Sequence, residues 1–156
     1  MMEWSTHALS GVALGYMVTN DWKGAIIGGI SSIIPDLDEP RSKFGKLFFP
    51  ISIPIGWIFE HRTFTHSLLF FTICFSLSVI LFDFYIALAI ISGIIAHVLG
   101  DMVTEKVQLL YPYKKDIGVS IPRFTYILID RIARLTLIVY IIFTIYQDVI
   151  VRNFIN

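Results

Sequence analysis

The chain has 156 residues and no net charge at neutral pH; 56% of its residues are hydrophobic and only 15% are charged, giving a mean hydropathy of +0.75. A soluble domain carries about 25% charged residues, so this chain lacks the polar surface needed to cover itself in water. The composition predicts one membrane-embedded domain over residues 1–156, and the zero net charge gives no basic field that would indicate a nucleic-acid partner.

The first two apolar segments, Ser5–Thr19 and Trp22–Ile34, are short for membrane-spanning helices, which need about 20 residues. The turn sequence TNDW joins them, so we expect a tight helical hairpin. His7 opens the first segment, and Asp36 and Asp38 of the motif PDLD follow the second. The hairpin would therefore bring these three side chains to one side. It also carries small residues of the kind that let membrane helices pack closely, namely Gly11, Gly15, Gly24, Gly28 and Gly29.

The third apolar segment, Leu47–Phe59, contains Pro50, Pro54 and Gly56 within thirteen residues. Prolines break the hydrogen-bond ladder of a helix, and the segment is too short to cross a bilayer. We therefore predict that it is re-entrant or lies at the membrane interface.

The last three apolar segments, His66–Phe82, Phe84–Gly100 and Tyr126–Val151, approach or exceed the length of a spanning helix. The first two of them are separated only around Asp83, which favours an antiparallel pair. The polar stretch from Asp101 to Thr125 lies between the second and the third, with YPYKKD as its expected turn. The predicted fold class is all-α: a polytopic membrane bundle of about five helices plus the broken segment.

Polar motifs lie at the ends of these segments. HRTFTHS places His61 and His66 around a helix start, with Thr63 or Thr65 as the expected N-cap. HVLGD places His97 and Asp101 four residues apart, hence on one helix face and suited to sharing a metal. If the third segment does not cross the membrane, all four histidines of the chain lie at the same membrane face.

The positive charges predict that this face is cytoplasmic in a multi-pass protein of the inner membrane. Only Lys23 and Arg152 fall on the opposite side. Ten basic residues share the side of the histidines: Arg41, Lys43, Lys46, Arg62, Lys106, Lys114, Lys115, Arg123, Arg131 and Arg134.

Four imidazoles and three carboxylates fit a dinuclear metal site, or one metal with a general base and supporting partners. Nitrogen and oxygen ligands without thiolates suit zinc, manganese or iron, as one or two ions. The single cysteine, Cys74, lies within an apolar run and cannot form such a site alone. The candidate metal ligands are His7, Asp36, Asp38, His61, His66, His97 and Asp101.

Two further charged residues leave alternatives open. Arg62 fits a lipid-headgroup anchor, an ion pair with Glu60 or Asp101, or a clamp on a phosphate beside the metal. Asp130, near the start of the last helix, fits an ion pair with Arg131 or Arg134, or a further site residue.

The series PDLD, HRTFTHSLL and HVLGDMVTEKVQLLYPY, after a histidine near the start, resembles the family of inner-membrane metal-dependent hydrolases associated with LexA regulation in some bacteria. The likeness extends from His7 to about Pro122. An acidic residue near the start of the last helix of the family is often Glu, and Asp130 would take its place. The polar positions of the family correspond here to His7, Asp36, Asp38, His61, Arg62, Thr65, His66, Ser67, His97, Asp101 and Thr104.

The motifs and the resemblance together predict a metal-dependent hydrolase at the cytoplasmic membrane face, acting on a lipid-like or other membrane-proximal phosphoester. Asp36, Asp38 and Arg62 are the candidate catalytic residues. The alternatives are a metal-ion carrier or sensor, and a non-catalytic scaffold with a structural metal that could act in a damage response. A carrier would need polar residues across the bilayer, where the fourth and fifth segments offer only hydroxyl groups at Thr72, Ser76, Ser78 and Ser92.

Overall fold

The computed structural model describes residues 3–151, and most of these residues are helical. Five of the helices (α1, α2, α5, α6 and α7) correspond to the predicted ones. The segment predicted to be broken contains one short helix, α4, which continues through Pro54, and the short helix α3 precedes it. The elements in chain order are α1 (Trp4–Thr19), α2 (Trp22–Ser31), the 3-10 turn η1 (Pro35–Asp38), α3 (Lys43–Leu47), α4 (Phe49–Ile58), the 3-10 turn η2 (Phe64–His66), α5 (Leu68–Leu81), α6 (Phe84–Thr104), β1 (Lys106–Val107), β2 (Ile117–Gly118), α7 (Arg123–Tyr146) and the π-helical turn η3 (Gln147–Val151).

The strands β1 and β2 are the departure from an all-α fold. They form a short antiparallel pair in which Lys106 faces Gly118 and Val107 faces Ile117. The pair closes the loop between α6 and α7 within the polar stretch where the sequence predicts a turn.

The predicted hairpin of α1 and α2 is present. Asn20 ends α1 in the left-handed region, with φ of 51°, a conformation that asparagine tolerates better than most residues. The side chain of Asp21 then caps α2 by accepting a hydrogen bond of 3.0 Å from the backbone N–H of Lys23. These two residues explain why the chain reverses within TNDW.

Helices α1, α2 and α6 form the core and meet at Gly28. A Cβ atom added to Gly11 of α1 would lie 2.4 Å from the carbonyl oxygen of Gly28, and one added to Gly93 of α6 would lie 2.1 Å from the same oxygen. The three backbones are therefore in direct contact, as in membrane helices that pack through small residues. His7 lies one turn before Gly11, and His97 lies one turn after Gly93, so this packing brings the two histidines together.

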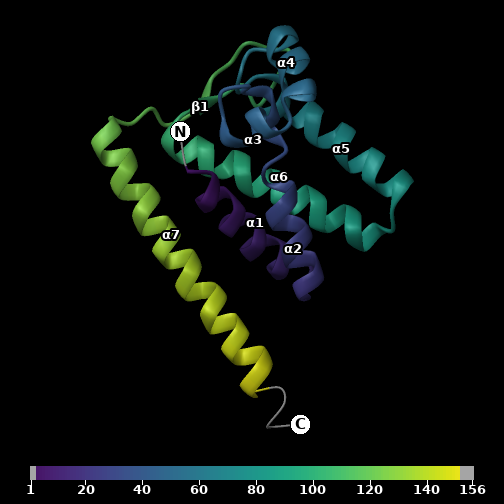
Figure 1. Ribbon diagram of the computed structural model, residues 1–156, viewed down its shortest axis with the longest axis vertical. Helices are drawn as coiled ribbons and strands as arrows, with labels where there is room; N and C mark the ends of the chain where they lie inside the picture. Colours follow the sequence, from purple (N-terminus) through teal and green to yellow (C-terminus); the bar gives the residue numbers. More distant parts are fainter. Residues whose placement is uncertain (1–2, 152–156) are drawn as a thin grey trace.

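Helix α7 runs along the outside of α1 and is attached to it at both ends (Figure 1). Near its start, Asp130 accepts a hydrogen bond of 3.0 Å from the backbone N–H of Glu3 and pairs with Arg134 at 2.5 Å. Near its end, Asp148 accepts hydrogen bonds from the indole of Trp22 and the hydroxyl of Tyr16. Of the alternatives for Asp130, the structure thus shows the ion pair, and it is made with Arg134.

Among the described helices, α6 alone is long and apolar enough to cross a membrane, while α4 and α5 are apolar but shorter. The polytopic arrangement therefore stays a prediction, as does the orientation inferred from the basic residues, of which Arg152 lies outside the described residues. The α4 helix contains Pro54 and exposes large apolar side chains, including Trp57 at 84% and Ile58 at 72%. Such exposure is what an interfacial segment needs.

Candidate metal centre

Five of the seven predicted ligands form a buried cluster, which consists of His7, Asp36, His66, His97 and Asp101. Every member is at most 3% exposed. Two groups within it have donor atoms that all lie within 4.8 Å of one another: His7 with His97 and Asp101, and Asp36 with His66 and His97. The cluster is built from α1, η1, η2 and α6, so four separate parts of the chain supply its members.

The distances within the buried cluster match those between ligands of one metal. His7 Nε2 lies 3.3 Å from Asp101 Oδ1, His66 Nε2 lies 3.4 Å from Asp101 Oδ2, and His97 Nε2 lies 3.5 Å from Asp36 Oδ1. An N–H···O hydrogen bond is shorter, usually about 2.9–3.0 Å. Two atoms bound at about 2.0–2.2 Å to a tetrahedral metal lie about 3.3–3.6 Å apart. The spacing is therefore compatible with coordination of a metal ion.

The donor atoms themselves have no protein partner within the described residues. Nε2 of His7, His66 and His97, and Oδ1 of Asp36 and Asp101, are buried without a hydrogen bond. Each such group costs about 1–3 kcal/mol when it is left unsatisfied. Cations bound in the two groups of close donor atoms would give these atoms a partner, so the donor set fits one or two divalent metal ions.

The charge balance of the site also favours a bound cation. The charge of Asp38 is balanced by His61, and that of Arg62 by Glu105. With neutral imidazoles at His7, His66 and His97, the buried carboxylates of Asp36 and Asp101 leave a formal charge of −2. Protonated histidines would balance it poorly, because the rings of His7 and His97 stack with centroids 3.8 Å apart, where two positive charges would repel. One divalent ion would neutralise this excess.

Asp38 and His61 lie outside both groups of close donor atoms and bond to each other, with His61 Nδ1 2.6 Å from Asp38 Oδ1. The other oxygen of Asp38 accepts a hydrogen bond from the hydroxyl of Thr65. The Thr65 oxygen can then accept from Nδ1 of His66, 2.9 Å away. This arrangement keeps the proton of His66 on Nδ1 and leaves Nε2 free to bind a metal.

The pKa values of the loop residues follow from these contacts. Burial raises the pKa of Asp36. Burial would also raise the pKa of Asp38, but the hydrogen bonds from His61 and Thr65 and the charges of the nearby imidazoles together lower it below the ordinary value. For His61, burial would lower the pKa, yet the Asp38 carboxylate raises it. Asp38 and His61 therefore form an ion pair beside the buried cluster.

Arg62 holds Asp101 in place. Its Nε donates a hydrogen bond of 2.9 Å to Asp101 Oδ2, and its Nη1 pairs with Glu105. The side chain is only 14% exposed, which does not fit a lipid-headgroup anchor, whereas the predicted pair with Asp101 is present. Its backbone has φ of 67°, a strained value for a non-glycine residue. Nη2 is buried and has no partner among the described residues.

The predicted helix cap in HRTFTHS is wrong. A 3-10 turn, η2, precedes α5, and the hydroxyl of Ser67 caps the helix by accepting a hydrogen bond of 3.2 Å from the backbone N–H of Phe70. Thr65 was one of the two expected caps, but its hydroxyl instead connects Asp38 to His66. The sequence pattern alone cannot show which hydroxyl residue caps the helix and which connects Asp38 to His66, because Thr and Ser are both good caps.

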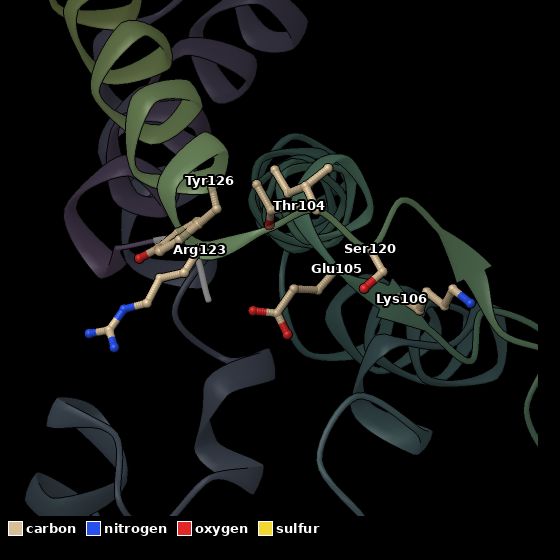
Figure 2. A pocket seen from close by; sticks show the side chains of 7 residues that line it. Thr104, Glu105, Lys106, Ser120, Arg123 and Tyr126 are labelled. Atoms are coloured by element: carbon tan, nitrogen blue, oxygen red, sulfur yellow. The ribbon is translucent and has the colours of Figure 1, made fainter.

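Two cavities lie near the buried cluster. One, of about 330 Å³, is lined by Asp36 together with Trp4, Arg41 and Lys43, and we call it the Asp36 cavity. The other, of about 620 Å³, lies between β1 and the start of α7 and is lined by Glu105 and Arg123, among others (Figure 2). None of its lining residues is a predicted ligand.

Sequence reasoning missed Glu105 and the residues that line the Asp36 cavity. Glu105 follows Asp101 by four residues, a spacing that places both carboxylates within reach of one guanidinium. Arg41 and Lys43 were counted only as positive charges of the cytoplasmic face. Their place beside Asp36 depends on how α3 packs against the start of α1, and the sequence does not show it.

The fold and the site define a helical protein with a buried histidine–carboxylate centre. The model of the family described as "YdjM inner membrane protein" matches residues 2–153, and the chain belongs to this family of inner membrane proteins. The expected resemblance to an inner-membrane family is thus confirmed, while the number of membrane crossings stays a prediction.

The chain is similar to two curated relatives. It is 37% identical over 90 residues to "Uncharacterized protein YvsG" of Bacillus subtilis (strain 168), covering 56% of each chain. It is 32% identical over 110 residues to "Inner membrane protein YdjM" of Escherichia coli (strain K12), covering 62% of this chain and 53% of that protein. The matches therefore span about half the length of these relatives. The comparison with solved structures found no match.

Proposed function

We propose that the chain is a membrane-bound, metal-dependent hydrolase that cleaves a phosphoester of a lipid or lipid-like substrate at the cytoplasmic membrane face. The observation that supports it most strongly is the set of five buried, unpartnered donor atoms at coordination spacing. Groups of this kind in a membrane protein are costly and usually functional.

In this proposal the buried cluster holds the metal, and Asp38 and His61 position the ligands around it. A divalent metal in such a site lowers the pKa of a bound water to about 7 and polarises a phosphoryl oxygen. Asp36 also lines a cavity, so its carboxylate is the one placed to accept a proton from an incoming water. The free Nη2 of Arg62 is placed to donate a hydrogen bond to an anion beside the cluster.

A lipid-like substrate follows from the surroundings of the site. The chain belongs to a family of inner membrane proteins, and α4 exposes apolar side chains close to η1, which carries Asp36 and Asp38. A phosphoester at headgroup depth could reach such a site without leaving the bilayer.

The test combines metal analysis with a substrate screen on detergent-purified protein. We expect one or two transition-metal ions per chain, lost when His97→Ala and Asp101→Ala are combined and retained in the exposed control Asp116→Asn. A screen of phospholipids and generic phosphoesters should show turnover that depends on the metal and on Asp36.

The other outcomes separate the remaining classes of function. A retained metal without turnover of any phosphoester would support a structural site and refute the hydrolase. Metal uptake into proteoliposomes would support a carrier. A protein that binds no metal under any condition would refute the metal centre itself.

A further inference from the structure

We propose that the Asp36 cavity is the subsite that binds the phosphate group of a membrane lipid, with Arg41 and Lys43 as its cationic residues. The inference rests on the proposed hydrolase function and adds to it the entrance to the site and the group recognised there.

The Asp36 cavity shares a wall with the buried cluster. Asp36 directs Oδ1 towards the imidazole of His97, 3.5 Å from Nε2, and the same residue lines the cavity. A group held in the cavity therefore lies next to a predicted metal ligand. The volume of about 330 Å³ is that of a small ligand pocket and can accept a headgroup phosphate.

The two cations that line the cavity have no acidic partner among the described residues, and the carboxylate of Asp36 is directed towards His97 instead. The guanidinium of Arg41 has no ion pair or hydrogen bond among the described residues, and Lys43 contacts only the ring of Trp4, with Nζ 5.3 Å from its centroid. Glu3, the other acidic residue of the lining, is paired with Arg134 at 2.9 Å. Two uncompensated cations favour an anion, and a phosphate is the anion that guanidinium and ammonium groups bind well.

The larger cavity of Figure 2 is a weaker candidate. It is lined by the carboxylate of Glu105, which pairs with Arg62, and by no member of the buried cluster. Its lining also includes the cations Lys106 and Arg123, but an anion held there would not lie next to a predicted metal ligand. The comparison of the two cavities favours the Asp36 side as the entrance for a phosphoester.

A lipid is the source of the phosphate that fits the surroundings. The cavity is walled by α3, whose Phe44 ring packs edge-on against Trp4 at 5.6 Å, and α4 follows α3 directly (Figure 1). Where α3 ends and α4 begins, the side chains of Leu47, Phe48 and Phe49 are exposed. Apolar side chains next to a cationic pocket allow acyl chains to stay in the bilayer while the phosphate enters the pocket.

The experiment measures binding without turnover. Metal-loaded protein is titrated with orthophosphate, and is separately tested with nanodiscs of phosphatidylcholine with and without phosphatidic acid, following the fluorescence of Trp4 against a Trp4→Phe reference. The double variant Arg41→Gln with Lys43→Gln removes both cations. Lys46→Gln is the matched control, because Lys46 is an exposed lysine of the same helix that does not line the cavity.

We expect the double variant to keep its metal and to bind phosphatidic acid at least about 10-fold more weakly, with Lys46→Gln close to the unchanged protein. Equal losses in the double variant and in Lys46→Gln would mean general attraction to an anionic surface and would overturn the subsite. Undiminished binding by the double variant would also overturn it. Binding of orthophosphate without any preference for phosphatidic acid would overturn the lipid as the source.

The subsite and the hydrolase can fail separately. Specific lipid binding without turnover of any phosphoester would support the subsite and refute hydrolysis. Metal-dependent turnover that is unchanged in the double variant would support hydrolysis and refute the subsite.

Discussion

Gly93→Ala is the substitution whose effect follows most directly from the packing of the core. The new Cβ would lie 2.1 Å from the carbonyl oxygen of Gly28 and 2.2 Å from Oγ of Ser31. Ordinary carbon–oxygen contacts lie about 3.4 Å apart, so α6 would have to move away from α2 by about 1 Å. One obstacle is backbone, which cannot rotate away as a side chain can.

The magnitude is a balance of two terms. Overpacking of a filled core costs about 1–3 kcal/mol, and a backbone obstacle places this site at the upper end. Alanine favours a helix over glycine by about 1 kcal/mol, which offsets part of the cost. The expected net loss is therefore about 2 kcal/mol in the free energy of unfolding. Because His97 is one turn further along α6, the displacement of α6 should also move His97 away from His7 and weaken metal binding.

The assay is reversible unfolding in detergent with metal analysis of the same samples. Gly29→Ala is the control, because its Cβ would meet Cγ2 of Val12 at 2.6 Å, a side-chain atom that can shift. We expect Gly93→Ala to be less stable than this control and to lose metal. A Gly93→Ala protein with unchanged stability and a full complement of metal would refute the close contact of α2 with α6 as the device that aligns the two histidines.

Further predictions concern the centre itself. Thr65→Val should weaken metal binding about 10–100-fold by removing the hydroxyl between Asp38 and His66, whereas Thr65→Ser should restore it; titration with a competing chelator measures both. Asp101→Asn should destabilise the protein by about 1–3 kcal/mol, because Arg62 loses one of its two carboxylate partners; unfolding curves that match those of the unchanged protein would contradict this. Metal affinity should fall as the pH is lowered, since imidazole ligands must be unprotonated. Protons should also compete for Asp36 at a higher pH than for an ordinary aspartate, because burial raises its pKa, so affinity that is independent of pH from 5 to 8 would exclude histidine ligands. Removal of the metal by a chelator should lower the thermal midpoint, as five buried polar atoms lose their partner.

The local structure of the chain was readable from the sequence because it depends on neighbouring residues. The apolar runs and the turn TNDW predicted five helices and the hairpin. The segment expected to be broken by its prolines instead contains the short continuous helix α4. The four-residue spacing of His97 and Asp101 placed them on one face of α6, as helix geometry requires. Those features follow from hydrophobic runs, turn residues and helical pitch, which act over a few residues.

The composition of the site was decided by tertiary structure. The sequence offered seven equivalent ligands, but the fold places five at coordination spacing and pairs Asp38 with His61. It also assigns Arg62 to Asp101 and Glu105, and sets Arg41 beside Asp36. Three of these pairs, Asp38–His61, Arg62–Asp101 and Arg62–Glu105, join residues that are 23 to 43 positions apart in the chain. Their distances are set by the approach of α1, α2 and α6 through glycine, and no local pattern in the chain encodes how closely three backbones can pack.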